Sequence, residues 1–238
     1  MRANQRVAGV VRAVVRLFGW LVRLILGLLV LSALWALAYR FVDPPITSPM
    51  LRDALAGQHV ERTWVELDRI APAMPRAVIG AEDATFCAHS GFDLAAIEQA
   101  AARNAESSKL RGGSTISQQT AKNAFLWPGR SYLRKGLEAY FTVLIEALWG
   151  KRRIMEVYLN IAELGPGIYG VEAAARHYFD VSAAQLSPRQ AARIAAILPQ
   201  PIKRDAAALR GAVKRHARAI EKRIGVVRRG SIDSCLAR

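Results

Sequence analysis

An apolar segment near the N-terminus constrains the fold of this chain more than any other feature. From Leu17 to Tyr39 the only charged residue is Arg23, and the uncharged part is rich in Leu, Val and Ala. A helix needs about 20 mainly apolar residues to cross a bilayer, so this run suffices if Arg23 extends toward the interface. We therefore expect one transmembrane helix over residues 17–40, followed by a domain outside the hydrocarbon.

Positive charge flanks this segment on its N-terminal side. Four arginines precede it with no acidic residue among them: Arg2, Arg6, Arg12 and Arg16. Because cytoplasmic flanks are enriched in Arg and Lys, we expect residues 1–16 to be cytoplasmic and the rest periplasmic or extracytoplasmic. The helix would then be a signal anchor in the inner (plasma) membrane. A cleaved signal peptide is the alternative, since Ala36-Leu37-Ala38 is an acceptable cleavage signal.

The net charge of +15 resembles that of a nucleic-acid-binding protein, but its distribution argues against that function. Residues 1–40 carry +6 and residues 203–238 carry +8, which leaves only +1 for residues 41–202. The positive charge therefore lies at the two ends of the chain, where anionic lipid headgroups are the expected partner. Nucleic acid is not an expected partner.

The rest of the chain predicts one mainly α-helical domain. We expect a proline-containing linker over 41–63, a domain over 64–226 long enough for a substantial core, and an unstructured basic tail over 227–238. The last helix is expected to pack on the domain, with a membrane-surface helix as the alternative. No stretch alternates well enough to predict a sheet. Helices are expected at residues 75–88, 94–105, 115–123, 132–149, 154–160, 169–179, 188–198 and 206–226.

The stretch from Glu82 to Asp93 contains more titratable groups than a buried helix requires. On a helix, Glu82, Phe86 and His89 would share one face, and Gly91 would end the last turn. That arrangement suits a carboxylate beside a cleft. A capped helix end with a satisfied acidic pair would explain the same residues, because charged residues are usually solvated. This segment alone does not decide between the two interpretations.

A glycine turn and a polar helix follow at Gly112–Asn123. Thr115 and Gln118 fit a capping box, and the glycines let the backbone approach a ligand closely. The free N–H groups of a helix start, with Lys122 one or two turns later, predict an anion site. It is not a P-loop, because no Gly-Lys-Ser/Thr follows at the required spacing.

Two further segments place charged side chains on helices. Arg134 and Lys135 precede Glu138 by about one helical turn, so two cations and a carboxylate can meet on one face. Alone, such a group is more often a surface ion pair of little energetic value. In the segment Lys151–Asn160, Glu156 shares a face with Asn160 while apolar residues point inward. Each segment has a structural explanation by itself, but their order and spacing together do not.

In order and almost letter for letter, these four segments resemble the signature motifs of the family 51 glycosyltransferases, peptidoglycan polymerases with a lysozyme-like helical fold. The stretch Gly165–Tyr178 resembles a later motif of that family, and the resemblance covers about Trp64 to Pro201. One departure is Gln200-Pro201, where the family often has Asn-Pro. The resemblance implies a monofunctional biosynthetic transglycosylase without a transpeptidase domain. Such an enzyme polymerises lipid II into β-1,4-linked strands with inversion and releases undecaprenyl pyrophosphate.

The resemblance also implies roles for individual residues. Glu82 matches the catalytic glutamate, and its apolar neighbours would favour proton uptake from the acceptor hydroxyl. Glu138 matches the second functional glutamate and would orient cations or a bound metal. Asp83, Glu156 and Asn160 are expected to support the structure rather than react. The residues expected to bind the sugars and the pyrophosphate are Ser114, Thr115, Gln118, Gln119, Lys122, Asn123, Arg134 and Lys135.

Cofactors and partners follow from the same comparison. The four histidines lie at no ligand spacing, so we expect no metal site and no required cofactor, although Mg²⁺ or Mn²⁺ can accompany a pyrophosphate. The expected partners are lipid II, the growing glycan chain, membrane lipid and other cell-wall synthesis or division proteins. Cys87 and Cys235 are too far apart to predict a framework, and whether they pair stays open. The stretch 106–113 is expected to border a mobile flap.

Two other functions remain as alternatives. A lytic transglycosylase or lysozyme-like hydrolase shares the fold and the paired carboxylates, but it protonates a sugar oxygen and has little use for the cations at 122, 134 and 135. A non-catalytic, membrane-anchored cell-wall scaffold would tolerate the change Glu82→Gln, whereas a polymerase would not.

Overall fold

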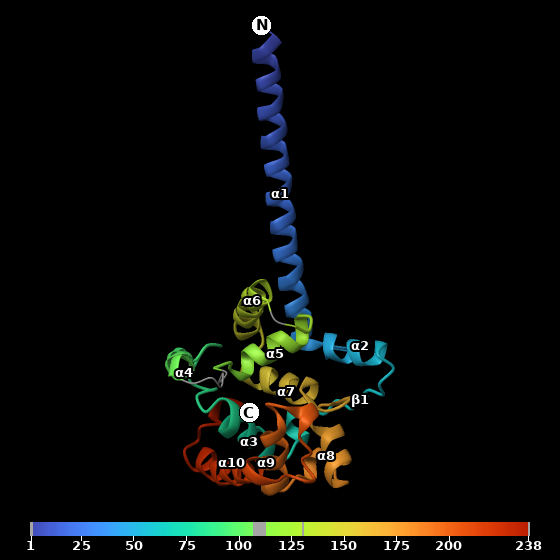
Figure 1. The fold of residues 1–238 in the computed structure, drawn as a ribbon, viewed down its shortest axis with the longest axis vertical. Coiled ribbons are helices and arrows are strands. Elements are labelled where there is room, and N and C mark those ends of the chain that lie inside the picture. Colours follow the sequence, from blue (N-terminus) through green and yellow to red (C-terminus); the bar gives the residue numbers. More distant parts are fainter. Residues whose placement is uncertain (1, 107–112, 130, 238) are drawn as a thin grey trace. The chain divides into compact units, whose positions relative to one another are not determined.

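The computed structural model describes residues 2–106, 113–129 and 131–237, and it divides into two units, Met1–Val42 and Asp43–Arg238 (Figure 1). The first unit consists of helix α1 (Arg2–Phe41). Its part Val15–Phe41 has a mean hydropathy of 2.3 and is long and apolar enough to cross a membrane. This agrees with the membrane helix expected over 17–40.

The second unit is mainly helical, as expected. One group of helices is α3, α9 and α10, which pack against each other, and α5 packs on both α6 and α7 in a second group (Figure 1). Short 3₁₀ segments lie between or after these helices: η1 (Leu67–Arg69), η2 (Ala183–Gln185), η3 (Pro201–Lys203) and η4 (Ser234–Leu236). The helices are α2 (Ser48–Leu55), α3 (Ala73–Glu82), α4 (Leu94–Glu106), α5 (Ile116–Phe125), α6 (Tyr132–Leu148), α7 (Lys151–Ile161), α8 (Val171–Phe179), α9 (Pro188–Ile197) and α10 (Gly211–Arg229).

The core follows from helical periodicity. Val78 and Ile79 of α3, and Ile194 and Ile197 of α9, are fully buried. On α10 the buried residues are Ala217, Ile220, Ile224 and Val227, which form one stripe at helical spacing. The last helix therefore packs on the domain, as expected, and its apolar stripe faces the protein interior.

A small sheet was not expected. Strands β1 (Glu61–Arg62), β2 (Glu163–Gly165) and β3 (Ile168–Tyr169) form a sheet of order β1-β3-β2, in which β1 pairs with β3 in parallel and β2 pairs with β3 antiparallel. Strands of two or three residues are too short to show alternation, so sequence periodicity could not reveal them.

The linker expected over 41–63 is also corrected. This segment contains α2 and β1, and α2 carries Asp53, which is 4% exposed. The hydroxyl of Tyr169 donates a hydrogen bond to Asp53 Oδ2 at 2.6 Å, and Arg52 forms an ion pair with Asp53 at 2.7 Å. The segment is therefore packed into the domain rather than spanning a gap before it.

We expect Tyr169→Phe to lower the free energy of unfolding by about 1.5–3 kcal/mol, because a buried hydrogen bond to a charged group is lost. Each kcal/mol corresponds to roughly 2–4 °C in Tm for a domain of this size. The matched control is Tyr132→Phe, since Tyr132 is 99% exposed. Thermal unfolding of both variants measures the effect. Equal Tm values would mean that α2 does not stabilise the domain.

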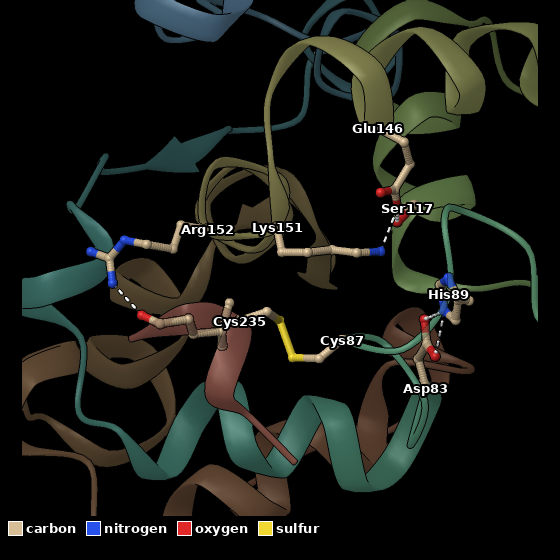
Figure 2. The surroundings of a disulfide bond; sticks show 9 residues. Asp83, Cys87, His89, Ser117, Glu146, Lys151, Arg152 and Cys235 are labelled. Carbon is tan, nitrogen blue, oxygen red and sulfur yellow. Dashed lines mark hydrogen bonds and ion pairs between the residues drawn. A yellow bond between two sulfur atoms is a disulfide. The ribbon is translucent and has the colours of Figure 1, made fainter. Parts of the chain in front are cut away.

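The unstructured tail expected over 227–238 is a second correction. Helix α10 continues to Arg229, and η4 (Ser234–Leu236) follows. Cys235 forms a disulfide with Cys87, so the two cysteines left open by the sequence do pair (Figure 2). The loop expected over 106–113 falls mostly on residues 107–112, outside the described residues.

Candidate active site

Glu82 is the last residue of α3, where the chain leaves the helix and enters the loop before α4. Its Oε2 accepts a hydrogen bond from Nε2 of Gln119 at 3.0 Å. The Oε1 of Gln119 in turn accepts one from the hydroxyl of Tyr158 at 3.2 Å. Because Tyr158 engages the amide oxygen, the amide nitrogen of Gln119 faces the carboxylate. This chain of hydrogen bonds fixes the direction in which Glu82 points.

The surroundings of Glu82 make it a stronger base than an ordinary glutamate. Burial raises the pKa of Glu82, and the nearby charge of Asp83 raises it further. The hydrogen bond from Gln119 and the charges of Arg204 and Lys122 act in the opposite direction without cancelling the rise. No ion pair holds the Glu82 carboxylate in the described part of the chain, so its free oxygen stays available for a proton.

Asp83 has a structural role, as expected. Its Oδ2 accepts a hydrogen bond from the backbone N–H of Ile116 at 2.9 Å, and Nε2 of His89 lies 3.0 Å from both carboxylate oxygens (Figure 2). The prediction that Glu82, Phe86 and His89 share one helix face is wrong. Helix α3 ends at Glu82 because Asp83 adopts a non-helical conformation and joins the start of α5 instead.

The start of α5, where the sequence predicts an anion site, has fewer free N–H groups than expected. The carboxylate of Asp83 already accepts a hydrogen bond from the N–H of Ile116. Thr115 and Gln118 form the expected capping box, and Thr115 Oγ1 donates to the carbonyl of Gly91 at 2.6 Å. Both residues are nearly fully buried. They therefore join the first two motifs to each other.

A pocket of about 280 Å³ opens beside Glu82. The end of α3, the start of α4 and the segment 113–115 form its walls, and Ser114 lines it together with Glu82 and Asp93. The structure thus brings together Glu82 from the first motif and Ser114 from the second. Gln119 contacts Glu82 directly.

Glu138 is a buried carboxylate that pairs with two cations on α6. Its Oε2 accepts a hydrogen bond from Arg134 at 3.2 Å, and its Oε1 pairs with Lys135. The Glu138 side chain is 4% exposed, whereas that of Lys135 is 51% exposed. The Nε of Arg134 is buried and has no hydrogen-bond partner in the described residues. Arg134 therefore retains a donor for which a bound anion would be a partner.

Lys122 links the two halves of the site electrostatically. Burial lowers the pKa of Lys122; the charge of Glu138 raises it, while the like charges of Arg134 and Lys135 lower it. The charge of Lys122 also acts on Glu82. A buried cation thus lies within electrostatic range of both functional glutamates. Asn123, the next residue along α5, is half-buried.

Glu156 and Asn160 brace the chain before α3, as expected. Glu156 Oε2 accepts a hydrogen bond from the N–H of Leu67 at 2.9 Å. Asn160 is fully buried and bonds both the N–H and the carbonyl of Val65, each at 2.8 Å. These contacts satisfy both side chains and fix segment 65–67 on α7.

Two charged residues of the site were not singled out by the sequence. Arg204, just after η3 (Pro201–Lys203), lies close enough for its charge to lower the pKa of Glu82. Burial raises the pKa of Glu163 on β2, and Lys122 and Arg52 lower it. Both residues lie outside the segments that resemble the catalytic motifs, so only the fold brings them near. Tyr158, which lies among the inward-pointing residues of the segment Lys151–Asn160, is the third residue of the site that the sequence did not single out.

A larger groove lies elsewhere, between α9 and α10, with a volume of about 680 Å³. It is lined by Arg189, Arg193, Ala207, Ala208, Leu209, Lys214, Ala217, Arg218, Glu221 and Lys222. None of the predicted site residues lines it, so size does not identify the active site. Among the described residues, no group of three or more His, Cys, Asp or Glu side chains could hold a metal ion.

Comparison with known proteins adds independent evidence. A family model described as "Transglycosylase" matches residues 50–225. A biosynthetic peptidoglycan transglycosylase of Caulobacter vibrioides is 55% identical over 199 residues, 84% of this chain and 87% of that protein. Proteins of the same name from Jannaschia sp. and Rhodospirillum centenum are 49% and 47% identical, covering 92% and 93% of this chain and 90% and 96% of their own lengths. The similarity therefore extends over most of the chain.

Proposed function

This chain belongs to the transglycosylase family, and we propose that it polymerises lipid II into β-1,4-linked glycan strands, with inversion and release of undecaprenyl pyrophosphate. It is a peptidoglycan glycosyltransferase, and glycan polymerisation serves cell-wall synthesis. The observation that carries the mechanism is the Glu82 carboxylate, which is desolvated, oriented by Gln119 and held by no ion pair among the residues that the structure describes.

Inversion requires one base and no covalent enzyme nucleophile. Glu82 takes the proton of the acceptor 4-hydroxyl while that oxygen attacks the anomeric carbon, and the pyrophosphate leaves from the opposite face. The raised pKa of Glu82 increases its basicity in the attacking step. Gln119 and Tyr158 hold the carboxylate in place, which reduces the entropy lost on reaching the transition state.

The leaving pyrophosphate develops negative charge and needs fixed cations. Lys122, Arg134 and Lys135 supply them, and Glu138 orients the last two. The unpartnered Nε of Arg134 supports this role, because a phosphate oxygen would satisfy it. We assign sugar or phosphate contacts to Ser114 and Asn123 at the edges of the site. Thr115 and Gln118 act indirectly by holding the loop.

No protein-held metal or other cofactor is required in this mechanism. The three cations carry the charge that a metal would otherwise neutralise. A Mg²⁺ or Mn²⁺ ion, where it takes part, would arrive with the diphosphate and help to neutralise its charge, and Glu138 would be the carboxylate that holds it.

We propose that α1 anchors the enzyme in the inner membrane, with residues 1–16 in the cytoplasm and the catalytic domain in the periplasm. The apolar stretch Val15–Phe41 and the arginines before it support this topology. The Cys87–Cys235 disulfide also supports it, because disulfides persist in oxidising compartments. Anionic lipid headgroups and other cell-wall synthesis proteins are the proposed partners, and nucleic acid is not.

The test is incubation of the detergent-solubilised protein with lipid II, followed by separation of glycan strands and released undecaprenyl pyrophosphate. A polymerase yields both products. Cleavage of preformed glycan without polymerisation would indicate the lytic alternative, and absence of both activities would indicate a scaffold.

The pH dependence follows from the raised pKa of Glu82. A base must be ionised, so we expect kcat/KM to fall as pH drops through this pKa, with a midpoint above the value of about 4.3 typical of free glutamate. Initial rates of strand formation between pH 4 and pH 8 would measure it, with Tm recorded at each pH to exclude unfolding. A midpoint at or below 4.3 would contradict the burial of this carboxylate.

A further inference from the structure

The C-terminal segment after α10 is fastened to the domain at three points. Asp233 forms an ion pair with Arg76 on α3 at 2.7 Å, and the guanidinium of Arg152 on α7 donates to the carbonyl of Leu236. Between these two contacts lies the disulfide from Cys235 to Cys87, whose Cα atoms are 5.4 Å apart (Figure 2). Only this middle contact is covalent.

Cys87 belongs to the loop that begins at Glu82. Within that loop, Asp83 supports the start of α5, and Gly91 accepts the hydrogen bond from Thr115. Gly91 has a φ of +95°, and a side chain there would lie 2.8 Å from Thr142 on α6, so only glycine fits this close approach. The end of the loop is thus fixed to α5 and α6.

The middle of the loop is held by one buried ring and by the disulfide. Phe86 is fully buried and lies under the ammonium of Lys151, 4.6 Å from the ring centre. Lys151 in turn pairs with Glu146, which accepts a hydrogen bond from Ser117 (Figure 2). The other side of the loop faces solvent. Its exposed residues are Ala84, Thr85, Ala88 and Ser90. The disulfide is the covalent tie on this stretch.

We propose that the Cys87–Cys235 disulfide positions the loop between Glu82 and Gly91, and that closing this bond completes the catalytic site. The proposal rests on the role of Glu82 in the proposed function. Without the bond, the polar contacts that hold the described C-terminal segment to the domain are one partly exposed ion pair and one hydrogen bond, and such contacts contribute little on their own. The segment would leave Cys87, and the loop would lose a support five residues after the base.

Bond closure is a two-electron oxidation. The two thiols lose two protons and two electrons to a disulfide-bearing oxidant, whose own S–S bond becomes two thiols. Such oxidants act outside the reducing cytosol. Because both cysteines are half-buried, they are accessible to exchange. A catalytic domain still in the cytosol would therefore keep its loop unfastened, and the domain would reach full activity only after crossing the membrane.

The experiment compares the oxidised enzyme with Cys87→Ser/Cys235→Ser and with the wild type reduced after folding. We expect kcat for lipid II polymerisation to fall about 10- to 100-fold at a temperature well below Tm, with KM changed much less, because the base is misplaced rather than the substrate lost. Reoxidation of the reduced wild type should restore kcat. A mass change of two hydrogens verifies the thiol state.

Two readouts separate positioning from stability alone. Hydrogen exchange at the Ile116 amide should speed up in the reduced protein, because Asp83 holds that N–H. The titratable groups that face Glu82 are Asp83, Lys122, Arg204 and Tyr158. If the loop loosens, Glu82 becomes better solvated and its pKa falls. The drop of kcat/KM on the acidic side of the pH profile should then move to lower pH.

Asp233→Asn is the matched control, since it removes the neighbouring ion pair and keeps the disulfide. It should stay within about twofold of wild-type kcat. The proposal is overturned if the folded double variant and the reduced wild type show a lower Tm but unchanged kcat, Ile116 exchange and pH profile. It is also overturned if Asp233→Asn is equally impaired with its disulfide intact. An inactive oxidised wild type would instead contradict the proposed function.

Discussion

Glu82→Gln is expected to reduce lipid II polymerisation by about 10²- to 10⁴-fold, the range typical of a lost general base. The amide keeps the size of the side chain and can still bond Gln119, but it cannot accept the acceptor hydroxyl proton. Burying an amide also costs less than burying a carboxylate next to Asp83, so Tm should stay equal or rise. Strand formation and thermal unfolding of the same preparation measure both effects.

Glu66→Gln provides the control for this change. Glu66 is an exposed glutamate that no ion pair holds in the described residues, so its variant should polymerise at the wild-type rate. More than a tenth of the wild-type rate in Glu82→Gln would show that another group takes the proton. A loss of activity accompanied by a lower Tm would point to misfolding, contrary to the expected stability.

Features encoded within a few residues were predictable from the sequence. The capping box of Thr115 and Gln118 spans one turn, and its side-chain pattern alone predicts where α5 begins. The pairing of Glu138 with Arg134 and Lys135 on α6 follows from helical spacing in the same way. The helices with one apolar stripe, such as α10, were also predictable from their periodicity.

Features that join distant segments were not predictable. Asp83 bonds Ile116 across 33 residues, Asp53 meets Tyr169 across 116, and the disulfide spans 148. In each case the sequence places the residue in a helix, a linker or a tail. The structure shows that a distant partner fixes it, and no local pattern specifies that partner. The start of α5 shows the consequence, because the sequence pattern presents the N–H of Ile116 as free, whereas Asp83 accepts its hydrogen bond.

The two glutamates of the site differ in their environments rather than in their chemistry. Glu82 is desolvated and accepts a hydrogen bond from the amide of Gln119, and no ion pair holds it within the described ranges, so it retains the capacity to take a proton. Glu138 is buried and forms ion pairs with two cations, Arg134 and Lys135. The environments assign Glu82 to proton transfer and Glu138 to organising the charge that meets the pyrophosphate.

Glu138→Gln is therefore expected to impair both folding and catalysis. Arg134, whose side chain is 10% exposed, would lose its counter-charge, and breaking a buried pair from one side typically costs about 3–5 kcal/mol. The misplaced cations should also lower kcat by about 10²- to 10³-fold, as for other lost transition-state contacts. Chemical denaturation measures the first effect, and strand formation under stabilising conditions measures the second.

A double variant separates the two effects. In Arg134→Gln/Glu138→Gln the buried guanidinium that lost its partner is also removed, so most of the lost stability should return, whereas activity should stay low because the pyrophosphate has lost a cation. Recovery of stability without recovery of activity would support Glu138 as the residue that positions Arg134 and Lys135 for the leaving group. Recovery of both would show that Glu138 serves only to neutralise Arg134, and the leaving-group charge would then have to be met by Lys122.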